Sequence, residues 1–118
     1  MKVLFDTNIL IDFTSGYEEA RRVLRSHRSA AISVISRIEL LSGPVTTVQA
    51  VRDVLNDVET IQIDEAVTEA AAVIRRDTRL KLPDAAILAT AQVHGLTLLT
   101  RDQRDFGGLV KVQIPYRL

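Results

Sequence analysis

The amino-acid sequence predicts an α/β fold in which helices flank a mainly parallel central sheet. Short apolar runs typical of strands alternate along the chain with longer stretches whose apolar residues recur at helical spacing. Glycine, proline and helix-capping residues separate these segments. Because strands connected through helices run parallel and have both faces covered, the pattern indicates an α/β sandwich, and the length suits one domain over residues 1–118.

The N-terminal segment predicts one strand and two short helices. Residues 3–5 are apolar and are followed at once by Asp6, so this acidic residue is expected at the carboxyl end of a strand. Apolar residues within 9–13 and again within 17–24 fit a helical pair.

The next segment predicts a strand followed by a helix that carries an acidic residue. Residues 30–32 suit the strand, and Ser33 suits the N-cap of the helix. Glu39 lies in an apolar stretch of this helix, at the edge of the side expected to be buried. That side is formed by Ile35, Ile38 and Leu41.

The middle of the chain predicts a helix, a strand and a second helix. Apolar spacing within 45–58 indicates the first helix, and residues 60–63 alternate as in a strand. Asp64 suits the cap of an alanine-rich helix. The apolar stripe of that helix contains Val67, Ala70, Ala71 and Ile74.

The C-terminal segment predicts one more helix and two strands. Pro83 suits the first turn of the helix and Gly95 its end. Residues 97–100 form a predicted strand that leads directly to Asp102, and residues 110–114 offer a further short strand.

The composition is that of a globular protein, and it excludes several kinds of covalent link and active site. The sequence lacks cysteine, which excludes disulfides, thiolate metal sites and a cysteine nucleophile. An acidic residue at position 6 comes too early for a signal-peptide core, and no apolar run approaches the ~20 residues of a membrane span. We therefore expect a cytoplasmic protein without a membrane partner. Fifteen basic and fifteen acidic residues balance, so an acidic pocket would leave basic residues in excess elsewhere.

Three acidic residues are expected at one edge of the sheet. Asp6 and Asp102 follow strands, and ligands of parallel sheets bind beyond the carboxyl ends of the strands. Asp84 lies in a helix's first turn, which favours an ionised carboxylate. Glu39 could lean into the same pocket or reach solvent. A cation would relieve the repulsion among converging carboxylates, and oxygen ligands suit Mg²⁺, with Mn²⁺ as a substitute. Capping alone could also explain Asp6 and Asp84.

Four motifs in order make the chain similar to the PIN-domain family, and most of all to the VapC-type toxins of type II toxin–antitoxin systems. The likeness spans nearly the whole chain. The residues concerned are Asp6-Thr7-Asn8, Ser36-Arg37-Ile38-Glu39-Leu40, Leu82-Pro83-Asp84-Ala85-Ala86-Ile87, and Leu99-Thr100-Arg101-Asp102 with Arg104-Asp105-Phe106.

The resemblance implies a PIN-like α/β/α sandwich and an endoribonuclease that uses Mg²⁺ or Mn²⁺. Asp6, Glu39 and Asp84 match the family's three most characteristic acidic positions, Asp102 matches the fourth, and Asp105 matches an acidic residue before the family's phenylalanine. The hypothesis is that Asp6 and Asp84 anchor the metal, Asp102 assists directly or through water, and Glu39 positions or deprotonates the attacking water.

The same resemblance implies supporting residues and partners. Thr7 and Thr100 match a hydroxyl near the metal, and Asn8 would orient the site. Arg101 and Arg104 are placed to touch phosphates of the RNA substrate. The family also implies a homodimer and a cognate antitoxin. The antitoxin would dock near the early apolar stripe of Ile9, Leu10 and Phe13.

Two other functions remain open from the sequence. A haloacid-dehalogenase-like phosphatase also places an aspartate after its first strand, but it needs a second acid two residues later, where this chain has Asn8. A catalytically silent PIN module would only bind RNA or protein. Such a module would normally have lost one of its acidic residues, whereas this chain has the full set.

Overall fold

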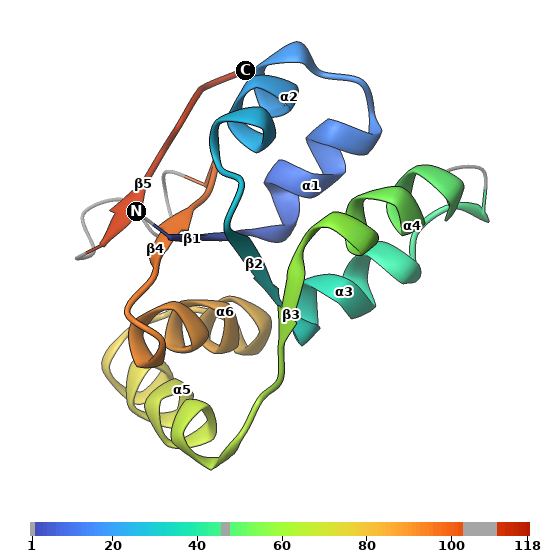
Figure 1. The fold of residues 1–118 in the computed structure, drawn as a ribbon. Coiled ribbons are helices and arrows are strands. Elements are labelled where there is room, and N and C mark those ends of the chain that lie inside the picture. Colours follow the sequence, from blue (N-terminus) through green and yellow to red (C-terminus); the bar gives the residue numbers. More distant parts are fainter. Residues whose placement is uncertain (1, 46–47, 103–110) are drawn as a thin grey trace.

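The structure is a computed structural model that describes residues 2–45, 48–102 and 111–118. Within these ranges lie five strands and six helices (Figure 1). The strands are β1 (Val3–Phe5), β2 (Ala30–Ser33), β3 (Glu59–Ile61), β4 (Thr97–Leu99) and β5 (Val112–Gln113). The helices are α1 (Thr7–Thr14), α2 (Glu18–Ser26), α3 (Val34–Leu41), α4 (Val48–Asp57), α5 (Glu65–Asp77) and α6 (Leu82–Val93).

The five strands form one sheet in the order β3-β2-β1-β4-β5, and every pairing in it is parallel. The central strand β1 pairs with β2 on one side and with β4 on the other, so that Leu4 lies opposite Ala31 and Leu98. The prediction of a mainly parallel sheet is confirmed. Because β1 is central, the residue that follows it comes out at the middle of the sheet's carboxyl edge.

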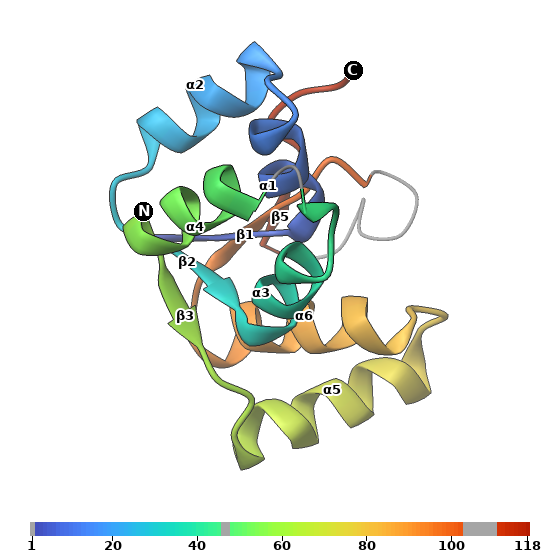
Figure 2. The ribbon, with the colours of Figure 1, turned by 90° about the vertical axis from the view of Figure 1, so that its right-hand side faces the viewer.

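Helices cover both faces of the sheet, as the three-layer prediction required (Figure 2). Alternation along β1 divides the core: Leu4 packs in the cluster that contains residues of α5 and α6, whereas Val3 and Phe5 pack with residues of α1, α3 and α4. All three side chains are at most 1% exposed. The α/β/α sandwich therefore buries β1 completely between two apolar layers.

Several predicted caps are present. Ser33 Oγ accepts a hydrogen bond from the Ile35 N–H at 3.0 Å, and Asp64 Oδ1 accepts one from the Val67 N–H at 2.9 Å. Gly95 follows α6 with a φ of +66°, a conformation that favours glycine at the end of a helix. These three residues fix where α3, α5 and α6 begin or end.

Four predicted strands differ from the structure in their bounds. The strand expected over 30–32 continues to Ser33 in β2, and the strand expected over 97–100 ends at Leu99 in β4. The strand expected over 60–63 is β3 (Glu59–Ile61). Its last residue, Ile61, lies opposite Ser33, which is the last residue of β2 and the N-cap of α3. Residues 62 and 63 have no neighbouring strand to pair with and are exposed. The strand expected over 110–114 is β5 (Val112–Gln113), and position 110 lies outside the described residues.

The expected buried side of α3 is wrong. Ile38 and Leu41 are 55% and 40% exposed, and Ile35 is half-buried, whereas Ser36 and Leu40 are buried. The helix packs against α1, α4 and α6, and this arrangement turns a polar serine inward and leaves two apolar side chains outside. The pattern of apolar residues misled the prediction because the innermost side chain of this helix is polar.

Among the described helices, none is long and apolar enough to span a membrane. The longest of them, α5, has 13 residues, fewer than the ~20 that a membrane-spanning helix requires.

Candidate active site

Asp6 lies where the central strand β1 passes into helix α1. Its backbone N–H donates to the Leu99 carbonyl at 2.9 Å, which continues the pairing of β1 with β4. Its side chain caps α1, with Oδ1 accepting the Thr7 N–H at 2.8 Å. Only 5% of Asp6 is exposed. The strand, the helix and the neighbouring strand together hold one buried carboxylate at the sheet's edge.

The second oxygen of Asp6 is held by Thr100, which follows β4. The Thr100 hydroxyl donates to Asp6 Oδ2 at 2.7 Å. Thr100 Oγ1 also accepts the Asp102 N–H at 3.0 Å and the Asn8 Nδ2 amide at 3.2 Å. Because two donors already occupy this oxygen, its own hydrogen is directed to Asp6. Both oxygens of Asp6 are therefore acceptors, as an ionised carboxylate requires.

Glu39 reaches the same site from α3. Thr7 Oγ1 lies 2.8 Å from Glu39 Oε1 and 2.8 Å from Ser36 Oγ. The threonine has a single hydroxyl hydrogen and an ionised carboxylate can only accept, so this hydrogen goes to Glu39 and the Ser36 hydroxyl supplies its own to Thr7. Glu39 is exposed, whereas Thr7 and Ser36 are buried. The glutamate is thus fixed by a buried hydroxyl pair and still faces solvent.

The electrostatics of Asp6 show which acidic residues share its surroundings. The pKa of Asp6 is raised from 3.8 to about 6, chiefly by burial, with smaller contributions from the negative charges of Asp84 and Glu39. Hydrogen bonds from the Thr100 hydroxyl and the Thr7 N–H oppose the rise. Two of the other predicted acidic residues, Asp84 and Glu39, therefore both act electrostatically on Asp6 at this edge of the sheet.

The remaining acidic residues are placed at the ends of other elements. Asp84 is half-buried in the first turn of α6, after Pro83. Asp102 is half-buried and bonded through its backbone to Thr100. Asp105 and Arg104, predicted as a fifth acid and an RNA contact, lie outside the described residues.

The chemistry of the site suits a hard divalent cation. Carboxylates and threonine hydroxyls supply oxygen only, and a positive charge would offset both the burial and the repulsion that raise the pKa of Asp6. In the part of the chain that the structure describes, no three acidic or histidine side chains enclose a metal by themselves. Mg²⁺ fits such a site, because it takes one or two carboxylates and keeps several waters.

Asn8 connects the site to the segment after β4. Its Nδ2 donates to Thr100, and its Oδ1 accepts the Arg101 N–H at 3.1 Å. One amide of α1 therefore holds two successive residues of that segment.

The sequence reasoning missed Asp12 and Tyr116. Asp12 is 3% exposed, and its carboxylate accepts two bonds from the Arg101 guanidinium, from Nε at 2.7 Å and from Nη2 at 3.1 Å. The Tyr116 hydroxyl donates to the same carboxylate at 2.7 Å. Asp12 lies four residues after Asn8, and this spacing on one helix face was the available signal. Two of the three guanidinium nitrogens of Arg101, which was predicted to touch RNA, thus donate hydrogen bonds to Asp12.

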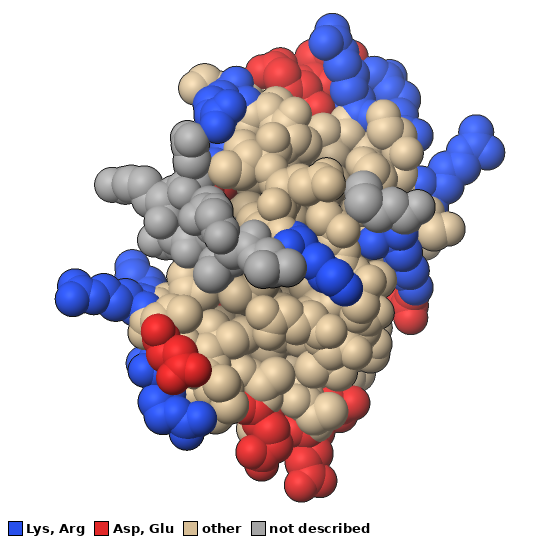
Figure 3. All heavy atoms as spheres, turned by 90° about the vertical axis from the view of Figure 1, so that its left-hand side faces the viewer, with Lys and Arg blue, Asp and Glu red and all other residues tan. Residues whose placement is uncertain are grey.

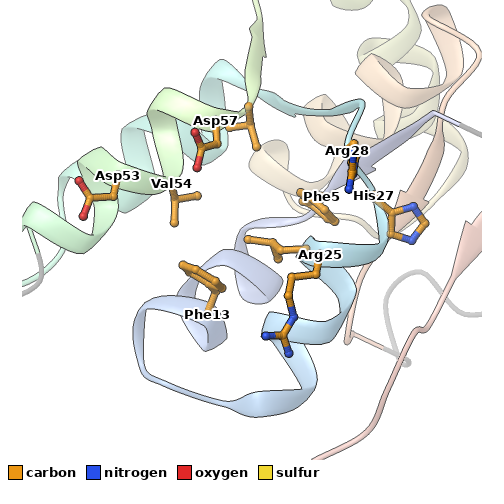
Figure 4. A pocket seen from close by; sticks show the side chains of 10 residues that line it. Phe5, Phe13, Arg25, His27, Arg28, Asp53, Val54 and Asp57 are labelled. Carbon is orange, nitrogen blue, oxygen red and sulfur yellow. The ribbon is translucent and has the colours of Figure 1, made fainter.

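A pocket of about 340 Å³ lies between α2 and α4, and none of the acidic residues of the site lines it (Figure 4). Its apolar lining includes Phe5, Phe13 and Val54, and its charged lining includes Arg25 and Asp57. Figure 3 shows the side of the molecule opposite to that of Figure 2. On that side, Lys and Arg side chains lie mostly around the margin, with some blue also near the middle, and uncharged residues fill much of the face below it.

Comparisons with known proteins place the chain in a family. The family model of the PIN domain matches residues 3–109. The chain is 42% identical to a chain in a toxin-antitoxin complex from Klebsiella pneumoniae, with a TM-score of 0.92 over 98% of this chain and 99% of that one. None of the curated proteins compared with the chain matches it.

Two more distant structures share the fold. One is VapBC2 from Rickettsia felis bound to a DNA fragment from their promoter, at 18% identity and a TM-score of 0.78 over 96% of this chain and 98% of that one. The other is VapBC-5 from Mycobacterium tuberculosis, at 22% identity and a TM-score of 0.71 over 99% of this chain and 98% of that one.

Proposed function

The chain belongs to the PIN-domain family, and on that basis we propose that it is a nuclease that hydrolyses RNA with Mg²⁺ or Mn²⁺ and acts as the toxin of a toxin–antitoxin pair. One observation supports this most directly. Asp6 is buried at the edge of the sheet, and its pKa is raised to about 6, mainly by this burial and further by the charges of Asp84 and Glu39. A folded protein keeps an ionised carboxylate buried beside like charges at a cost in stability, which a bound cation would offset.

Each acidic residue has a role that follows from its position. Asp6 and Asp84 would hold the metal, because one is fixed by two hydrogen bonds and the other acts on it electrostatically. A bound divalent ion would stabilise charge on the phosphodiester and lower the pKa of a water. Asp102 would assist directly or through water. Glu39 is exposed and oriented by Thr7, so it can position or deprotonate the attacking water.

The test is cleavage of RNA by the purified protein. We expect cleavage with Mg²⁺ or Mn²⁺, none in EDTA, and recovery when metal is restored. Asp6→Asn removes one charge with little change in shape and should abolish cleavage. The matched control is Asp77→Asn, which removes the same charge from an exposed position at the end of α5 and should leave cleavage unchanged. Cleavage that persists in chelator, or full activity of Asp6→Asn, would refute the metal-dependent mechanism.

The proposed partner is a cognate antitoxin, since the 42% identical structure is a toxin-antitoxin complex. Of the apolar stripe expected to receive it, Ile9 and Leu10 are fully buried, and only the half-buried Phe13 lines the pocket of Figure 4. The pocket's apolar lining and charged residues suit an amphipathic helix of the antitoxin.

We expect the product of the neighbouring gene to co-purify with the chain and to suppress cleavage. Phe13→Glu should weaken the complex while nuclease activity remains. An antitoxin that binds this variant as tightly as the unaltered chain would place its contact elsewhere. Light scattering on the same samples tests the homodimer that the family resemblance implies.

A further inference from the structure

A partly buried ion pair joins helix α1 to the segment that follows β4. The Asp12 carboxylate, in α1, accepts both the Nε and Nη2 hydrogens of Arg101, and the side chains are 4% and 36% exposed respectively. The hydrogen bond to Asp12 raises the pKa of the Arg101 guanidinium above its ordinary value. Tyr116 adds a third hydrogen bond from the C-terminal segment. Asp12 therefore links helix α1 both to the segment after β4 and to the C-terminal segment.

The segment held in this way is the one that orients the acidic site. Arg101 stands between Thr100, whose hydroxyl donates to Asp6, and Asp102, whose N–H donates to Thr100. Asn8 and Asp12 are four positions apart on α1, so they lie on one face of the helix. Asn8 holds the backbone of Arg101 and Asp12 holds its side chain, so both ends of this residue are fixed.

We propose that the Asp12–Arg101 ion pair, completed by Tyr116, is a positioning device that keeps residues 100–102 aligned for metal binding at the acidic site. Arg101 is then a positioning residue and not a contact to RNA. The inference rests on the proposed function only in that the site binds a divalent metal. It requires neither RNA as substrate nor a toxin role.

The physical reason is that the alignment of Asp6 depends on Thr100. Without the ion pair, the Arg101 side chain loses its attachment to α1, and the segment is then held through the Asn8 contacts, the Thr100 hydroxyl bond to Asp6 and the Thr100 N–H bond to the Gln113 carbonyl at 3.1 Å. A planar guanidinium fixes its partner through two parallel bonds, which a lysine ammonium cannot reproduce. Groups that orient metal ligands typically change metal affinity by about 10–100-fold when removed.

The experiment measures Mn²⁺ binding to the purified chain by calorimetry and electron paramagnetic resonance, without RNA. Arg101→Gln and Asp12→Asn should each weaken Mn²⁺ binding by about 10–100-fold. The double variant should bind Mn²⁺ no more weakly than whichever single variant binds it less tightly, because both substitutions break the same Asp12–Arg101 contact. Arg101→Lys should recover part of the loss. Arg52→Gln, which removes an arginine from an exposed position on α4, should bind as the unaltered chain does.

The double variant and Tyr116→Phe keep the test decisive if a single substitution in the ion pair prevents folding. The double variant leaves no unpaired buried charge, and Tyr116→Phe removes one hydroxyl while the ion pair stays. Each should fold, and each should bind Mn²⁺ more weakly. Normal Mn²⁺ binding by folded variants would overturn the inference, as would a defect confined to the KM for RNA, which would make Arg101 a substrate contact.

Failure of the inference can be distinguished from failure of the proposed function. If the unaltered chain binds Mn²⁺ but cleaves no RNA, the proposed function fails and the positioning role is still decided by the Mn²⁺ affinities of the variants. If the chain cleaves RNA and all folded variants bind Mn²⁺ normally, the positioning role fails and the proposed function stands.

Discussion

The Thr100 hydroxyl donates to Asp6 Oδ2 at 2.7 Å, although the two residues are 94 positions apart. Parallel pairing explains the contact: Phe5 lies opposite Leu99, so the residues that follow β1 and β4 emerge side by side. The same hydroxyl oxygen accepts bonds from Asn8 and Asp102. One threonine therefore sets the orientation of the central carboxylate and ties it to two further residues of the site.

Thr100→Val should test this role, because valine keeps the approximate shape of threonine and removes its hydroxyl. Asp6, Asn8 and the Asp102 N–H would each lose a partner, so we expect the free energy of unfolding to fall by about 1–3 kcal/mol. Mn²⁺ affinity should fall by about tenfold. Denaturant unfolding and metal titration measure both effects. Thr100→Ser keeps the hydroxyl and should retain most of the stability and affinity; equal losses in both variants would contradict an orienting hydroxyl.

The raised pKa of Asp6 predicts how the stability of the metal-free protein depends on pH. The pKa is about 6 in the folded protein and has an ordinary value of 3.8, so the folded state binds this proton more tightly. Its stabilising contribution is complete below about pH 4 and is lost as the pH rises through about 6. The loss by pH 7.5 amounts to about 3 kcal/mol at most.

Asp6→Asn isolates this contribution from the titration of other groups. The variant cannot ionise, so the difference in unfolding free energy between it and the unaltered chain should change between pH 4 and pH 7.5, with the variant gaining at the higher pH. Mg²⁺ should stabilise the unaltered chain at pH 7.5 and much less at pH 4.5, since it binds the ionised carboxylate. A pH-independent difference between the two proteins would show that Asp6 has an ordinary pKa.

Glu39→Gln should separate catalysis from metal binding. Glu39 is exposed, so its replacement should change the free energy of unfolding by no more than about 0.5 kcal/mol. If the carboxylate positions or deprotonates water, the rate of RNA cleavage should fall by about 10²–10⁴-fold while Mn²⁺ affinity changes little. Single-turnover kinetics and calorimetry provide the two measurements. Glu69→Gln, at an exposed position of α5, is the control; a large loss of Mn²⁺ affinity in Glu39→Gln would make Glu39 a ligand instead.

The parts of the site that local sequence could predict are those fixed by neighbouring residues. Asp6 follows a short apolar strand and Asp84 follows a proline at the start of a helix, and these signals span only a few positions. The pairing of Arg101 with Asp12 joins positions 89 apart and that of Tyr116 with Asp12 joins positions 104 apart. Such contacts depend on how α1 sits over the sheet, which no local pattern specifies.

Helix α3 shows the same limit for the core. Its apolar residues suggested a buried side, but the interior of the protein at this point contains the hydroxyl pair of Thr7 and Ser36 that orients Glu39. A helix that brings a polar group to the site cannot also bury its most apolar side there. The rotation of α3 that brings Ser36 and Glu39 to Thr7 therefore leaves Ile38 and Leu41 exposed.

Two alanine substitutions in α3 test this rotation. Leu40 is 5% exposed and packs in the cluster beside α1 and α4, so Leu40→Ala should lower the free energy of unfolding by about 2–5 kcal/mol. Ile38 is 55% exposed, so Ile38→Ala should change it by no more than about 0.5 kcal/mol. Denaturant unfolding at low protein concentration measures both. A larger loss for Ile38→Ala than for Leu40→Ala would mean that α3 turns its apolar pattern inward, and the contact between Thr7 and Glu39 would then not form.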